Sequence, residues 1–224
     1  MKSDLNRDAN ENDIPLRSLT VEDVARLPLP GTLHPTDVAF SPDDRSLTFL
    51  WSPDGSLSRQ LYAFDLETGQ EQAVVEPPVE AASEVGVSRE EALRRERQRR
   101  VTLGITEYAW ASNSDRLLIP ISGAICVQDG LAGPMRTLVE RGGSPALDPS
   151  LSPDGEWVAF SRDGEIWVVS ADSGEARQLT RGAFELGVTR GTAEFIAQEE
   201  MGRHHGIWWS PDGKRIAFAE IDES

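Results

Sequence analysis

The stretch PSLSPDGEWVAFSRDGEIWVVSADSGEARQLT, residues 149–180, decides the fold of this chain. A Ser-Pro-Asp-Gly turn precedes an alternating strand at 157–160, and an Asp-Gly turn precedes a second strand at 166–169. Proline suits the second position of a tight turn, and Asp-Gly tolerates the positive φ that such turns need. A further turn and a short strand at 176–179 follow. With the residues ahead of the first turn, the stretch predicts a unit of four short strands.

The same unit recurs along the chain. Its other copies begin with DVAFSPDDRSLTFL (37–50), with the weaker EYAWASNSDRLLIP (107–120), and with GIWWSPDG (206–213). From Asp43 to Asp212, the corresponding turn residues are separated by 70, 41 and 58 residues. Four strands per repeat, at spacings near 40 residues, indicate β-propeller blades. We therefore expect an all-β fold, a partial β-propeller of about four to five four-stranded blades, with an insertion in each of the two longer spacings.

The first insertion, SREEALRRERQRR at 88–100, has the pattern of an arginine-rich helix. Ser88 and Glu91 form a capping box, and glutamates stand four residues ahead of arginines in the favourable order. Because apolar residues are few, this helix is predicted to project from the propeller. A solvated, self-paired surface is the ordinary interpretation of such a charge pattern.

The second insertion, 190–206, carries two adjacent carboxylates, Glu199 and Glu200. They are either exposed acids of an acidic chain or a binding site for a cation. Neighbours on a regular helix point about 100° apart, so both reach one ligand only near a helix end or beside a pocket wall. Glu200 and His204 are spaced to share a metal ion, but hydrogen-bonded or exposed histidines are the ordinary case, and we expect no metal.

Composition and charge disfavour several classes of partner and of metal site. A net charge of −16 disfavours nucleic acid as a partner. A single cysteine, Cys126, permits no intramolecular disulfide and no cysteine-based metal cluster. Residues 1–16 are polar and predicted to be a disordered lead, followed by a short helix capped by Ser18 or Thr20. With neither a secretory signal nor an apolar span of membrane length in the sequence, a cytoplasmic protein is expected.

The sequence contains no nucleophile elbow, no convincing Ser/His/Asp set and no phosphate-binding glycine loop. On its residues alone, the chain is expected to have no catalytic residues and no cofactor.

The combination of motifs resembles the N-terminal part of the dipeptidyl peptidase IV family, within the prolyl oligopeptidase superfamily. The bacterial members and the cytosolic dipeptidyl peptidases eight and nine resemble it most. The resemblance spans nearly the whole of residues 17–224. It rests above all on an arginine-rich helix leading into GITEYAW (104–110), followed by FIAQEEMGR (195–203), a Trp-Trp pair and a terminal DES.

This resemblance implies a role for the paired glutamates. In the family they reach over the active-site cavity and bind the free α-amino group of the peptide, so that X-Pro or X-Ala dipeptides are released from the N-terminus. Glu199 and Glu200 match that pair. Arg99 best matches an arginine that binds a substrate carbonyl, with Arg95 and Arg100 as alternates.

The family also implies a complete propeller, a catalytic α/β-hydrolase domain and a homodimer as the full-length enzyme. Residues 1–224 contain the paired glutamates and the substrate-binding arginine that the family implies, but not the catalytic triad. No activity is therefore expected from them alone. One alternative is a non-catalytic propeller, which either binds peptides or proteins or is a truncated relic. Another is a metal-dependent hydrolase that uses Glu200 and His204.

Overall fold

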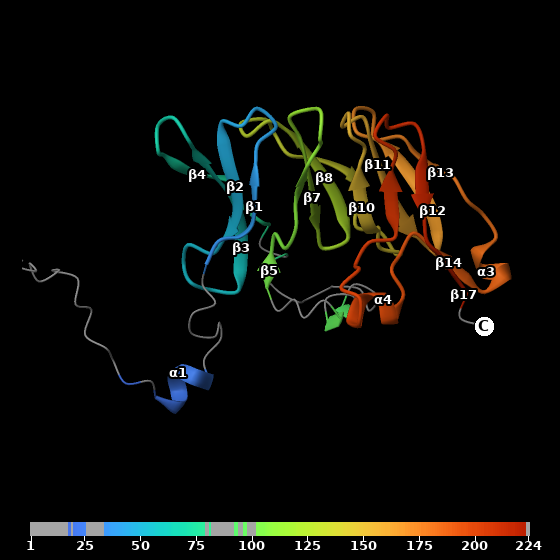
Figure 1. The fold of residues 1–224 in the computed structure, drawn as a ribbon, viewed down its shortest axis with the longest axis horizontal. Helices are drawn as coiled ribbons and strands as arrows, with labels where there is room; N and C mark the ends of the chain where they lie inside the picture. Colours follow the sequence, from blue (N-terminus) through green and yellow to red (C-terminus); the bar gives the residue numbers. More distant parts are fainter. Residues whose placement is uncertain are drawn as a thin grey trace, which may run out of the picture.

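A computed structural model describes residues 18, 20–25, 34–78, 81, 92–93, 96–97 and 102–222. Its β-sheets stand side by side in a row that follows the order of the chain (Figure 1). Within each large sheet, every strand pairs antiparallel with the next one in sequence. This meander is the arrangement expected of a propeller blade.

Three sheets have the four-stranded order. The first contains β1 (Thr36–Phe40), β2 (Ser46–Trp51), β3 (Ser58–Asp65) and β4 (Glu71–Val75), with β5 (Leu103–Gly104) added parallel to β3. The second contains β6 (Ala109–Trp110), β7 (Arg116–Ile121), β8 (Ala124–Asp129) and β9 (Arg136–Val139). The third contains β10 (Leu147–Leu151), β11 (Trp157–Arg162), β12 (Glu165–Ser170) and β13 (Ala176–Gln178).

Two shorter pairs follow the third sheet. β15 (Ile207–Trp209) and β16 (Ile216–Phe218) form a hairpin around the last Ser-Pro-Asp-Gly turn and begin a fourth blade. β14 (Val188–Arg190) pairs with β17 (Glu220–Asp222), so the chain on either side of that hairpin is joined. The all-β partial propeller is confirmed. The described residues form three four-stranded blades and the first two strands of a fourth.

One hydrogen-bond pattern explains why the Ser-Pro-Asp turns recur. The serine hydroxyl donates to the aspartate two residues later, at 2.6 Å from Ser41 to Asp43 and 2.5 Å from Ser152 to Asp154. The same aspartate oxygen then accepts the backbone N–H two residues further on, at 3.0 Å from Glu156. The side chains at Ser52–Asp54 and Ser210–Asp212 repeat this arrangement. Each turn is therefore stabilised by hydrogen bonds between residues that lie close together in the sequence.

The hydrophobic cores lie between successive sheets. The first is formed by residues such as Leu50, Leu61, Leu117 and Ile119, and the second by residues such as Leu118, Val127, Val158 and Phe160. A smaller third core joins the third sheet to the last hairpin through Ala159, Ile166, Val168 and Ile207. Because neighbouring residues of β7 and β11 contribute to cores on opposite faces, the second and third sheets are buried on both sides.

Short helices lie outside the sheets. In α1 (Val21–Ala25), Thr20 is the cap: its hydroxyl accepts the Asp23 N–H, and the Asp23 carboxylate accepts the Thr20 N–H, each at 3.1 Å. α3 (Ala183–Leu186) precedes β14, and α4 (Phe195–Glu199) lies beyond one end of the sheets (Figure 1). Among the residues that the structure describes, no helix is long and apolar enough to cross a membrane.

Candidate functional site

The second insertion begins at a buried ion pair. Arg190 donates from Nη1 to Glu165 at 3.0 Å and from Nε to Glu220 at 2.6 Å, which links β14 to β12 and β17. Burial raises the pKa of the Glu165 carboxyl, but hydrogen bonds from Thr180, Ala183 and Arg190 outweigh it and hold that pKa below its ordinary value. Arg190 and Glu165 are thus both ion-paired and hydrogen-bonded at the point where the chain leaves the sheets.

The two ends of the insertion meet at a narrow point, here called the neck: Gly191, Gly206 and Ala219. The N–H of Gly191 donates to the carbonyl of Ala219, and the N–H of Ala219 donates to the carbonyl of Gly206, both at 2.9 Å. A Cβ on Gly206 would stand 2.5 Å from the nitrogen of Thr192. Only glycine permits this approach, so the insertion leaves and returns at one place.

Within the insertion, α4 is held by its own side chains. The Glu194 carboxylate caps the helix by accepting the N–H groups of Ile196 at 2.6 Å and Ala197 at 2.9 Å. Gln198 is buried and donates from Nε2 to the Ala193 carbonyl at 2.6 Å. These bonds fix the rotation of the helix about its axis.

That rotation leaves Glu199 and Glu200 exposed. Glu199 is the last residue of α4 and Glu200 is its C-cap, with φ −101° and ψ −31°. The pair therefore stands at a helix end, which is the position from which adjacent carboxylates can reach one ligand. The carbonyl ends of a helix also favour a cation there. Arg95, Arg99 and Arg100 lie outside the described residues.

The part of the first insertion that is described lies against the second (Figure 1). The Arg97 guanidinium lies 5.4 Å from the centroid of the Phe195 ring in α4. Leu93 and Arg97 line a pocket of about 230 Å³ together with Asp148, Gln198 and His204. Within the described structure, Gln198 Oε1 and His204 Nδ1 are buried and have no hydrogen-bond partner, so polar groups face this pocket from the side of α4.

The two histidines of the second insertion have different surroundings. His205 Nδ1 lies 2.7 Å from the Asp148 carboxylate, whereas His204 lines the pocket. No group of three His, Cys, Asp or Glu side chains suited to a metal is found among the described residues. The contact between His205 and Asp148 was not predictable from sequence, because it joins residues 57 positions apart.

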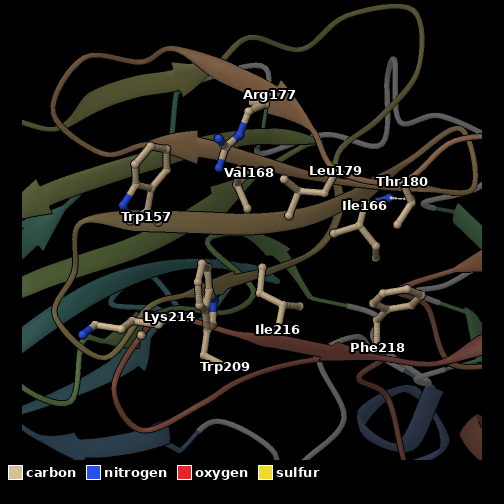
Figure 2. A pocket seen from close by; sticks show the side chains of 11 residues that line it. Trp157, Ile166, Val168, Arg177, Leu179, Thr180, Trp209, Lys214, Ile216 and Phe218 are labelled. Carbon is tan, nitrogen blue, oxygen red and sulfur yellow. Dashed lines mark hydrogen bonds between the residues drawn. The ribbon is translucent and has the colours of Figure 1, made fainter.

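A second concave region separates the third sheet from the last hairpin. Figure 2 shows side chains of the two elements facing one another across a groove of about 430 Å³, among them Trp157, Val168, Leu179, Trp209, Ile216 and Phe218. Among the described residues that line it, the charged ones are Arg177 and Lys214, both basic. The groove continues the third core outward, and this described lining offers no carboxylate to bind an amine. The glutamate pair is the stronger candidate site.

Comparisons with known proteins give matches along most of the chain. The sequence profile described as "Dipeptidyl peptidase IV (DPP IV) N-terminal region" matches residues 106–224. Human dipeptidyl peptidase 8 is 35% identical over 161 residues, which covers 61% of this chain and 18% of the human protein. A probable dipeptidyl-aminopeptidase B of Pyrenophora teres f. teres (strain 0-1) is 42% identical over 77 residues, 34% of this chain and 8% of the fungal protein.

Among solved structures, dipeptidyl peptidase 4 of Porphyromonas gingivalis superposes with a TM-score of 0.56 at 21% identity, covering 84% of this chain and 25% of that one. This similarity supports the fold alone. The chain thus spans a small part of each of these longer proteins.

Proposed function

Because the chain belongs to the family defined by the N-terminal region of dipeptidyl peptidase IV, we propose that it is the substrate-recognition segment of a serine dipeptidyl peptidase. Glu199 and Glu200 bind the α-ammonium group of a peptide, and X-Pro or X-Ala dipeptides are released. The observation that carries this proposal is the placement of both carboxylates, exposed, at the end of a helix whose rotation is fixed.

The chemistry of the pair suits an amine. A peptide α-ammonium has a pKa near 8 and is mostly charged at neutral pH. Two carboxylates hold it by charge-assisted hydrogen bonds, which are stronger than neutral ones. An amine held at a fixed distance from a nucleophile selects the bond after the second residue. In this proposal Arg99, on the first insertion, binds a substrate carbonyl.

The remaining parts of the proposal concern the longer protein. Acyl-enzyme chemistry belongs to an α/β-hydrolase domain outside residues 1–224, and the full enzyme is a cytoplasmic homodimer. The predicted lead, residues 1–16, lies outside the described residues. In this proposal the propeller comprises residues 17–224, with insertions at 88–100 and 190–206. Neither nucleic acid nor a membrane is a partner.

The test is the double variant Glu199→Gln/Glu200→Gln in the full-length protein. Loss of two charge-assisted hydrogen bonds predicts a fall in kcat/KM for Gly-Pro-p-nitroanilide of about 100-fold or more, with the thermal unfolding midpoint unchanged. Glu185→Gln, in the exposed first turn of α3, is the matched control and should change neither quantity.

An unchanged kcat/KM in the double variant refutes the role of the pair. Purified residues 1–224 provide a second check, because they should release no p-nitroaniline. Activity of that segment alone would place the catalyst within it and contradict the proposal.

A further inference from the structure

Asp148 connects the third sheet to the end of the second insertion. Its carboxylate is 3% exposed, and both oxygens contact the last two residues of the insertion. The N–H of Gly206 donates to Oδ2 at 2.7 Å, and His205 Nδ1 lies 2.7 Å from Oδ1. Loss of this buried carboxylate is unfavourable, because the buried Gly206 N–H is then left without its acceptor.

The backbone conformation of β10 directs the Asp148 side chain toward the second insertion. Asp148 has φ +49°, within an irregularity of the pairing between β10 and β11. Asp37 occupies the same position in β1, with φ +52° and a similar irregularity against β2. Each residue stands four positions ahead of the serine of its Ser-Pro-Asp turn. Aspartate tolerates this left-handed conformation better than most residues.

This repeated position joins one blade to the next. In the first blade the Asp37 carbonyl accepts a hydrogen bond from the Tyr108 hydroxyl at 2.6 Å, and Tyr108 directly follows Glu107, which holds the corresponding position of the second blade. In the third blade the Asp148 side chain reaches Gly206, the corresponding position of the fourth. Gly206 has an additional role, because it also lies at the neck of the second insertion, where its backbone packs closely against Thr192.

We propose that Asp148 is a positioning residue for the amine-binding pair. This inference rests on the proposed function of Glu199 and Glu200. By fixing His205 and Gly206 on the third sheet, Asp148 sets the angle at which residues 192–205 leave the propeller. The two carboxylates consequently keep one orientation toward the substrate amine, and substrate binding does not have to supply that ordering.

The decisive variant is Asp148→Gly in the full-length protein. Glycine keeps the positive φ without strain and removes both acceptor oxygens. KM for Gly-Pro-p-nitroanilide should rise about tenfold or more, whereas the rate of inactivation by an amine-free sulfonyl fluoride should stay within about twofold. Asp148→Asn retains an acceptor for the Gly206 N–H, so it should recover most of the lost affinity.

Asp37→Gly is the matched control, since it makes the same substitution at the same backbone position away from the insertion, and it should leave KM unchanged. Equal effects of Asp148→Gly and Asp37→Gly, or a parallel fall in sulfonyl fluoride reactivity, overturn the inference. If Asp148→Gly does not fold, His205→Ala removes the described contact between His205 and Asp148 at an exposed side chain. It should still raise KM, and an unchanged KM there is also a refutation.

The glutamate double variant, assayed alongside, separates the two proposals. If it impairs substrate binding while Asp148→Gly does not, the positioning role fails and the proposed function stands. If the double variant leaves kcat/KM unchanged, the proposed function fails and the positioning role fails with it.

Discussion

Gly206 shows how one residue type determines the geometry of the site. It has no positive φ to require glycine. Close approach of backbone atoms excludes a side chain instead, because a Cβ would stand 2.5 Å from the Thr192 nitrogen and 2.6 Å from the Gly191 carbonyl carbon. Backbone atoms on that side cannot rotate away, so an added methyl group has to open the neck.

Gly206→Ala should therefore destabilise the protein by about 1–3 kcal/mol and weaken substrate binding as α4 shifts. Gly143→Ala is the control, because Gly143 has open space around it and no positive φ. It should change the free energy of unfolding by less than about 0.5 kcal/mol. Urea unfolding of both variants measures the difference, and equal stabilities would contradict the steric argument.

Among the elements, the Ser-Pro-Asp turns share an electrostatic property. The hydrogen bond from Ser152 holds the pKa of Asp154 below its ordinary value of 3.8, and the corresponding serines act in the same way on Asp43 and Asp212. The pKa of Asp54 is lowered chiefly by the backbone N–H of Ser56. A carboxyl whose pKa is lower in the folded state stabilises that state at pH values above its unfolded pKa.

The stabilisation from these turns should consequently be complete above about pH 4 and be lost as the pH falls through the folded pKa values. Urea midpoints measured from about pH 6 to about pH 2.5 test this expectation. Asp154→Asn should reduce the pH dependence within that window, whereas Ser122→Asn, at another left-handed turn position, should leave it unchanged because it removes no carboxyl. An equal effect of both substitutions would argue against the turns as its source.

The local nature of these turns also explains what the sequence could predict. The strand at 157–160 and the turn before it depend on residues that are adjacent in the chain, and even the weaker copy near Asn113 forms a blade. The cap at Thr20 is local in the same sense. By contrast, β14 pairs with β17 across about 30 positions, and no short pattern reveals such a pairing.

The candidate site also has a part that depends on residues close in the sequence and a part that depends on distant ones. Glu199 and Glu200 were predicted as a binding pair from the family resemblance, and that role stays a prediction. Their position at a helix end follows from Glu194, which caps α4 nearby in sequence. Asp148 was missed because its role depends on an irregular strand in another blade. A weak signal existed: aspartate recurs four residues ahead of the turn serine in two copies of the repeat.

At the scale of the whole molecule, the first blade has one covered face and one uncovered face. Burial alternates strictly along β2, and Leu50 and Leu61 face the second blade. The strand register places Phe40, Phe49 and Tyr62 on the opposite face, where Phe40 is 59% exposed. No described residue covers this aromatic face, and an apolar face of this kind favours association.

Purified residues 1–224 should therefore self-associate as their concentration rises, with a second copy covering that face. Phe40→Glu should raise the dissociation constant about tenfold or more, because association would then bury an unpaired charge. Leu66→Glu, at an exposed apolar residue in the turn after β3, is the control. Sedimentation velocity distinguishes the outcomes: monomers at every concentration, or the same shift in both variants, would exclude this interface.

The neck has a consequence for how such a protein diversifies. The chain departs at Gly191 and returns at Gly206 within hydrogen-bonding reach of the same residue, Ala219. The distance between the two ends of the insertion is therefore set by the blades and not by the sequence of residues 192–205. Insertions, deletions or a grafted loop between these glycines would leave the register of β15 and β16 intact. Evolution or an engineer can thus exchange the insertion while the blades that carry it stay the same.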